Sequence, residues 1–273
     1  MAQALNGKLI TVFGGSGFIG RHVIRILAER GYSVRAAVRH PELAEHLQPL
    51  GAVGQIMPVA ASVRNKKSVE RAVEGACAVI NLVGILYESG AQKFESVQAK
   101  GPATVAEVCK EQGIDTLVHI SAIGADANSS AVYAKTKAAG EKAVLDAMPN
   151  AVIFRPSIVF GPEDDFFNRF GGMAQIFPTL PLIGGGNTKF QPVYVGDVAL
   201  AIANAAENKV EAGKIYELGG PGVATFKECL QLMMKITHRK RMLVNLPFPI
   251  ARIQAKFMQM LPKPMLTVDQ STC

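Results

Sequence analysis

Tryptophan is absent from this 273-residue chain, and charged residues make up only 19% of it. No apolar run is long enough to cross a bilayer, which excludes a helix of that kind from the sequence. Hydrophobic residues make up 49%, which is typical of a folded globular protein and excludes a disordered one. The four cysteines have neither metal-ligand spacing nor a disulfide pattern, so we expect reduced thiols and no metal. The first expected strand begins by about Lys8, which leaves no room for a targeting peptide and predicts a cytoplasmic protein.

Acidic residues are missing from one long stretch near the C-terminus. Outside that stretch the chain carries 22 Lys/Arg against 22 Asp/Glu, so the net charge of +7 belongs to the stretch itself. Within it, Pro249–Leu261 has amphipathic helical spacing, and it either packs on its own domain or lies on an anionic membrane surface. No nucleic-acid-binding motif accompanies the charge, so we expect no nucleic-acid partner. The stretch runs from Cys229 to Val268, and its seven cations are Lys235, Arg239, Lys240, Arg241, Arg252, Lys256 and Lys263.

A glycine-rich turn near the N-terminus has a strand on one side and a helix on the other. Lys8–Phe13 is a short apolar run of β-forming residues, and apolar residues recur at helical spacing from Ile19 up to Gly31. Backbone N–H groups at such a helix start bind a pyrophosphate, and glycine allows its close approach. A turn that binds nothing is the weaker alternative in this context. The residues expected at the pyrophosphate are Gly14, Gly15, Ser16, Gly17, Phe18, Ile19 and Gly20.

The end of the second expected strand, Ser33–Val38, indicates which nucleotide binds. Proteins that bind NAD place an acid about 20 residues after the glycine turn, for the ribose 2′-hydroxyl. Here no Asp or Glu occurs between Glu29 and Glu42, and Arg39 stands 19 residues after the last glycine of the turn. A guanidinium suits a 2′-phosphate, and His40 lies beside it. A solvated loop cation is the alternative, but the position favours NADP(H).

Strand-like and helix-like runs alternate along the chain, which predicts an α/β fold with a doubly wound parallel sheet. We expect a nucleotide-binding domain over 1–160 and a smaller C-terminal region over 161–273, interleaved with the first. The segment Gly161–Gly186, rich in Phe, Gly and Pro, is predicted to be a long functional loop. Further strands are expected at Gln55–Val59, Ala78–Val83, Thr116–Ser121, Ala151–Pro156 and Lys214–Glu217. Further helices are expected at Pro41–Leu50, Ser68–Val73, Phe94–Gln112, Ala131–Ala147, Val198–Glu207 and Phe226–Thr237.

Tyr133 and Lys137 stand four residues apart, on one face of a predicted helix. A phenol titrates near pH 10, too high for a base at neutral pH. A lysine cation one turn away favours the phenolate, so this pair could exchange a proton with a carbonyl or an alcohol. Chance produces many such pairs, but the place of this helix in a nucleotide-binding fold favours the functional interpretation.

These motifs together resemble the short-chain dehydrogenase/reductase superfamily, in its extended or atypical branch. Besides the glycine turn and the Tyr–Lys pair, Asn81–Gly84 and Arg155–Pro162 match its landmarks in order. The resemblance implies a Rossmann fold, with Tyr133 as acid/base and Lys137 on the nicotinamide ribose. It also implies a hydroxyl group after the fifth strand, where either Ser121 or Ala122 stands; alanine could not stabilise an oxyanion. Ser62 replaces the family's adenine-binding Asp. The remaining cofactor contacts that the resemblance implies are Val63, Leu82, Val83, Gly84, Pro156 and Ile158.

A closer resemblance covers nearly the whole chain. The runs Asp146–Ser157, Gly161–Phe170, Pro181–Gly184 and Gln191–Val198 are similar to the NAD(P)-binding accessory subunits of respiratory complex I. This resemblance implies NADPH held structurally, complex I subunits as partners, and a location peripheral to a bacterial inner membrane. The alternative is a free-standing NADP-dependent reductase or epimerase that uses the Tyr–Lys pair.

Overall fold

A computed structural model describes residues 7–246 of the chain. The chain divides into two compact units. Of the described residues, the first comprises 7–156 and returns for 195–217, and the second comprises 157–194 and 218–246. The predicted amphipathic helix Pro249–Leu261 lies outside the described residues. Within residues 7–246, no helix combines the length and apolarity that a membrane span needs.

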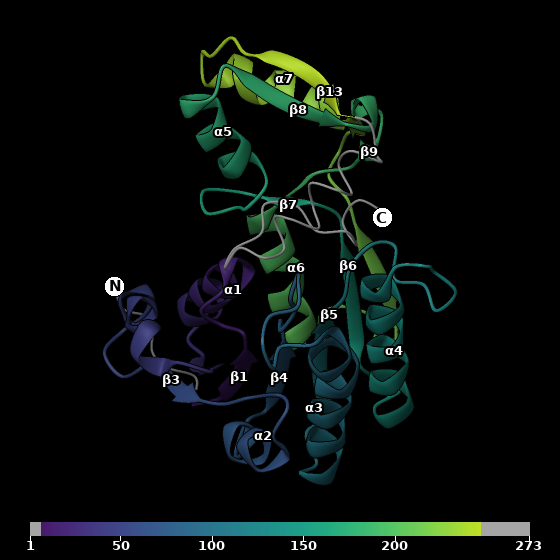
Figure 1. The fold of residues 1–273 in the computed structure, drawn as a ribbon. Helices are drawn as coiled ribbons and strands as arrows, with labels where there is room; N and C mark the ends of the chain where they lie inside the picture. Colours follow the sequence, from purple (N-terminus) through teal and green to yellow (C-terminus); the bar gives the residue numbers. More distant parts are fainter. Residues whose placement is uncertain (1–6, 247–273) are drawn as a thin grey trace. The chain divides into compact units, whose positions relative to one another are not determined.

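The first unit is built on a seven-stranded sheet with the strand order β11-β6-β5-β4-β1-β2-β3 (Figure 1). The pairs from β3 through β6 run parallel, and the order reverses direction between β1 and β4. This is the order of a doubly wound, Rossmann-type sheet, so the predicted fold class is confirmed. The strands are β1 (Leu9–Phe13), β2 (Ser33–Val38), β3 (Ile56–Ala60), β4 (Ala78–Asn81), β5 (Thr116–Ile120), β6 (Val152–Pro156) and β11 (Ile215–Leu218).

Helices cover both faces of this sheet (Figure 1). Alternate side chains of the strands, such as Phe13, Val79 and Leu117, pack against α2, α3 and α4 in one core cluster. Because the opposite face is covered by α1 and α6, the central strands are apolar on both sides, as parallel strands usually are. The helices are α1 (Phe18–Glu29), α2 (Lys66–Val73), α3 (Lys100–Glu111), α4 (Val132–Ala147) and α6 (Val195–Ala206).

Two predicted helices of this unit differ from the structure. Pro41–Leu50 forms two short 3-10 helices, Pro41–Leu43 and Glu45–Leu50, because Pro49 lacks the N–H that a continuous α-helix would need. The predicted helix Phe94–Gln112 begins with a π-helical turn, Glu95–Ala99, before α3. 

That π-helical turn packs closely on α4. A Cβ atom on Gly140 would lie 2.1 Å from the carbonyl oxygen of Gln98, so only glycine fits at this point of α4.

The second unit contains regular structure where the sequence predicted a loop. The prediction for Gly161–Gly186 was wrong, because the segment contains a helix and a strand. The strand pairs with residues about sixty positions later in the chain, a partner that no local pattern reveals. The elements are β7 (Val159–Phe160), α5 (Phe167–Ile176), β8 (Thr179–Ile183), a 3-10 turn (Gly184–Gly186), β9 (Lys189–Phe190), β10 (Val193–Tyr194), β12 (Ala224–Thr225), α7 (Phe226–Ile236) and β13 (Met242–Leu246).

Phenylalanine rings form much of the core of the second unit. Phe226, at the start of α7, meets the rings of Phe166, Phe170 and Phe190 at centroid distances of 5.3–6.4 Å. Leu180 and Leu230 are fully buried in the same cluster. These phenylalanines therefore stabilise the unit by packing on one another.

Two of the seven cations of the basic C-terminal stretch bind the unit's own backbone. Arg241 donates from Nε to the carbonyl of Ala174 at 2.8 Å, and Arg239 donates to Gly171 at 3.5 Å. Ala174 lies in the last turn of α5, where the helix dipole favours a positive charge, and Gly171 lies in the middle of the same helix. Arg252, Lys256 and Lys263 lie outside the described residues.

Candidate dinucleotide site

The turn between β1 and α1 is shaped so that only glycine fits at several points. Gly14 has φ +75°, and a Cβ atom on Gly20 would lie 2.5 Å from the carbonyl oxygen of Gly15. Gly17 is the N-cap of α1 and has no side chain to satisfy the first-turn N–H groups. Such groups have no partner within the helix and are available to an anion. The turn therefore fits the pyrophosphate of a dinucleotide.

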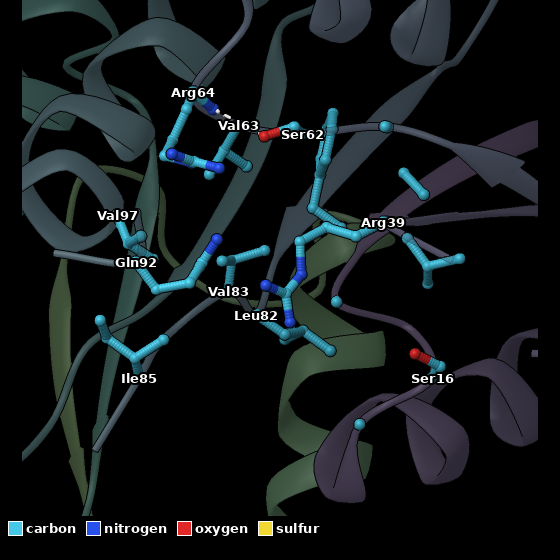
Figure 2. Close-up of a pocket in the computed structure, with 17 residues that line it drawn as sticks. Ser16, Arg39, Ser62, Val63, Arg64, Leu82, Val83, Ile85, Gln92 and Val97 are labelled. Carbon is cyan, nitrogen blue, oxygen red and sulfur yellow. Dashed lines mark hydrogen bonds between the residues drawn. The ribbon is translucent and has the colours of Figure 1, made fainter. Parts of the chain in front are cut away.

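A cavity of about 260 Å³ opens beside this turn, at the carboxyl ends of β1, β2, β3 and β4 (Figure 2). Ligands of doubly wound sheets bind at this edge. The sequence-predicted residues that line the cavity are Gly14, Ser16, Gly17, Arg39, Ser62, Val63, Leu82, Val83 and Gly84. Gly15, Phe18, Ile19 and Gly20 shape the adjoining turn and the first turn of α1.

Sequence analysis missed several residues of the lining. Arg64, Ile85, Gln92 and Val97 line the cavity as well. Arg64 stands two residues after Ser62, so the rule that ligands bind at strand ends could have found it. Gln92 lies eleven residues after β4 ends, and no local pattern places it at the cavity.

Arg39 directs its guanidinium into the cavity from the end of β2 (Figure 2). Within residues 7–246 it has no ion pair with an acid. His40 is not part of the lining: its Nδ1 lies 3.1 Å from Oε1 of Glu42, and both side chains are exposed. The cation at this strand end is therefore Arg39.

Ser62 is held by its own loop. Its N–H donates to Oγ of Ser68 at 2.9 Å, and its Oγ accepts from the N–H of Arg64 at 3.4 Å. A serine hydroxyl engaged in this way is a weak substitute for the carboxylate expected at this position. Val63 beside it is buried and gives the cavity an apolar wall.

Lys137 is buried on α4 and lies close to the cavity wall. Its Nζ donates to the carbonyl of Ile120 at 3.2 Å, and it lies 3.2 Å from where a Cβ atom on Gly84 would be. Burial lowers the pKa of Lys137 to about 8, while the charge of Glu141 acts in the opposite direction. Glu141 itself is held by two hydrogen bonds from Arg155, at 2.9 and 2.6 Å.

The other predicted catalytic and cofactor residues lie away from the cavity lining. Tyr133, one turn before Lys137, stacks edge-on against Phe94 at a centroid distance of 5.9 Å. Ser121 is buried just after β5, and its Oγ has no hydrogen-bond partner in the described part of the chain. Pro156 ends β6, and Ile158 belongs to the second unit, where its carbonyl accepts from Val193.

The profile of the NAD dependent epimerase/dehydratase family matches residues 10–219, which contain this entire site. The chain belongs to this family. Among described residues, no group of side chains that could hold a metal ion is present. The epimerase/dehydratase family match and the cavity geometry together support binding of a nicotinamide dinucleotide.

Comparison with individual proteins narrows the similarity further. The chain is 40% identical over 93% of its length to "NADH dehydrogenase (ubiquinone) 1 alpha subcomplex subunit 9, mitochondrial" of Arabidopsis thaliana, covering 64% of that protein. It is 36% identical over 92% of its length to the Rattus norvegicus protein of the same name, covering 66%. The chain thus spans just under two thirds of these relatives. The resemblance predicted from the sequence is confirmed.

A solved structure shares the fold. UDP-glucuronic acid 4-epimerase from Bacillus cereus, in complex with UDP-glucuronic acid and NAD, has a TM-score of 0.75 and 21% identity. The match covers 88% of this chain and 86% of that one.

Proposed function

We propose that the chain is an accessory subunit of a membrane-bound NADH–quinone oxidoreductase (complex I) that holds NADP(H) as a structural ligand. The observation that carries this proposal is the 40% identity to a subunit of NADH dehydrogenase (ubiquinone) over 93% of the chain. A ligand that binds only the folded state stabilises it by about 4 kcal/mol at a thousandfold its dissociation constant.

NADP(H) is proposed over NAD(H) because of the charge at the end of β2. Arg39 offers a guanidinium inside the cavity, and no acid is present there to bind a ribose 2′-hydroxyl. A guanidinium at this place favours the extra phosphate of NADP(H).

Copurification tests the proposal for the assembly. The tagged chain, produced at its native level and isolated from gently solubilised membranes, should bring down the other subunits of the NADH–quinone oxidoreductase. A preparation containing the chain and none of those subunits, under conditions in which the complex stays intact, would contradict the proposal.

The basic C-terminal stretch is proposed as the contact with the membrane-bound part. Lys235 and Lys240 are exposed in the second unit, while Arg239 and Arg241 bind α5. Neutralising the two lysines should release the chain from membranes at a lower salt concentration while nucleotide affinity is unchanged. Release at the same salt concentration as wild type would show that these two lysines make no such contact.

A second candidate function is an NADP-dependent reductase or epimerase. The position of Tyr133 and Lys137 one turn apart on the same face of α4 favours it. In that reaction Tyr133 would donate or accept the proton at the substrate oxygen, and the nicotinamide would supply or accept the hydride. Steady NADPH consumption with a carbonyl substrate, abolished by Tyr133→Phe, would establish this function. We expect no such consumption, because Ser121 is buried and Ala122 has no donor group.

A further inference from the structure

The segment between β4 and the π-helical turn, residues 85–94, is held by one hydrogen bond within it and by two to residues outside it. The side chain of Gln98 donates to the carbonyl of Ile85 at 2.7 Å, and Oε1 of Glu88 accepts from the N–H of Phe94 at 2.8 Å. Arg64, from the loop after β3, donates from Nη1 to the carbonyl of Ala91 at 2.9 Å. The bond from Arg64 joins this segment to the loop after β3.

Gln92 occupies a fixed place in this segment. Ser89 and Gln92 exchange two backbone hydrogen bonds, of 3.1 and 2.9 Å, around a tight turn in which Gly90 has φ +53°. The Arg64–Ala91 bond holds the residue immediately before Gln92. The side chain of Gln92 lines the cavity and points into it (Figure 2). A carboxamide held in this way can both donate and accept a hydrogen bond.

The side of the sheet identifies the part of the ligand that Gln92 would meet. Arg39 follows β2, and Arg64 follows β3, so both lie on the β3 side of the glycine turn. In this fold that side takes the adenosine half, and the β4–β5 side, where Lys137 lies, takes the nicotinamide half. Because Arg64 ties Gln92 to the β3 side, Gln92 faces the adenosine half although it follows β4 in the chain.

We propose that Gln92 is a contact residue of the dinucleotide site, with its carboxamide hydrogen-bonded to the adenosine half of NADP(H) and held in place by Arg64 through Ala91. This proposal rests on the proposed nucleotide ligand. The Gln92 carboxamide supplies a polar contact that Ser62, which is hydrogen-bonded within its own loop, does not supply. Gln92 binds the ligand in this account, and Arg64 is a positioning residue.

Calorimetric titration with NADPH, 2′,5′-ADP and nicotinamide mononucleotide tests the contact. Gln92→Leu should lower the affinity for NADPH and for 2′,5′-ADP by about tenfold each, as expected for the loss of one hydrogen bond. Affinity for nicotinamide mononucleotide should stay unchanged. Gln92→Glu should weaken both phosphate-rich ligands further, because its carboxylate adds a negative charge at the cavity. Gln112→Leu is the matched control, since Gln112 is exposed and bonds Glu70 away from the cavity.

Two outcomes separate this proposal from the proposed function. If wild type binds NADPH and 2′,5′-ADP and Gln92→Leu binds both equally well, the contact is refuted while the nucleotide ligand stands. If the variant loses affinity only for nicotinamide mononucleotide, the assignment of Gln92 to the adenosine half is refuted. If wild type binds neither NADPH nor 2′,5′-ADP, the proposed function fails and this proposal fails with it.

A double-mutant cycle tests the role of Arg64. Because Arg64 acts through Gln92, Arg64→Ala should weaken the binding of 2′,5′-ADP when Gln92 is present. In the Gln92→Leu background the same change should weaken that binding by less than about twofold. Arg64→Lys, which keeps a donor for Ala91, should restore most of the affinity. Losses that add fully in the double variant would show that Arg64 acts on the ligand directly, and would refute its positioning role.

Discussion

Replacing the buried lysine of α4 should change how stability depends on pH. Lys137 is only 4% exposed, and burial lowers its pKa from the ordinary 10.5 to about 8. One pKa unit corresponds to about 1.4 kcal/mol, so burying the charged form costs about 3 kcal/mol. Between pH 8 and 10.5 the unfolded chain binds this proton and the folded chain does not, so stability rises with pH across that window.

Lys137→Met removes this dependence and puts an unbranched apolar side chain of nearly the same length in place of the lysine. The free energy of unfolding of the variant minus that of wild type should be about 3 kcal/mol larger at pH 7 than at pH 10.5. Urea unfolding of the nucleotide-free proteins, followed by circular dichroism at both pH values, measures the difference. Lys142→Met on the same helix is the control, because Lys142 is exposed and paired with Asp146. An equal stability difference between Lys137→Met and wild type at pH 7 and pH 10.5 would refute the reasoning.

Three further predictions concern the glycine turn, the second core and the buried histidine. Gly20→Ala should abolish NADPH binding in calorimetry and lower stability by about 1–3 kcal/mol, because the new Cβ would meet the carbonyl oxygens of Gly15 and Gly14 at 2.5 and 2.6 Å. Phe226→Ala should destabilise the second unit by about 3–5 kcal/mol in urea unfolding, since it removes the central ring of the phenylalanine cluster. Burial, and the charge of Lys137, lower the pKa of His119 to about 3. Stability should therefore fall as the pH drops from 6.5 towards 3, and His119→Gln should flatten that loss in acid unfolding curves.

The sheet could be predicted from the sequence because its strands are short, continuous apolar runs. Ser33–Val38 was predicted to the residue and the other strands of this sheet within a few residues, since the central strands β1, β4, β5 and β6 are apolar and buried on both faces. The strand β13 was missed because its partner β8 lies about sixty residues earlier in the chain. Its apolar residues Met242 and Val244 are exposed, so the strand lacks the buried apolar run that marks the strands of the large sheet.

The candidate site likewise contains residues that the sequence could place and one that it could not. The glycine turn and Arg39 follow strands directly, so their positions could be predicted from the strand ends. Gln92 is brought to the cavity by a tight turn and by a hydrogen bond that Arg64 donates to the preceding residue, Ala91, 27 positions after Arg64 in the chain. Long-range ties of this kind leave no periodic signal, so the sequence alone could not place Gln92.

The affinities of the protein for NADPH and NADH test the central claim most directly. Calorimetric titration of wild type should give NADPH binding at least about tenfold tighter than NADH binding, because Arg39 is a cation directed into the cavity and no acid takes its place. Arg39→Asp should remove that preference, while Arg25→Asp, the same charge change on the exposed face of α1, should keep it. Equal affinity of wild type for the two nucleotides would contradict the account.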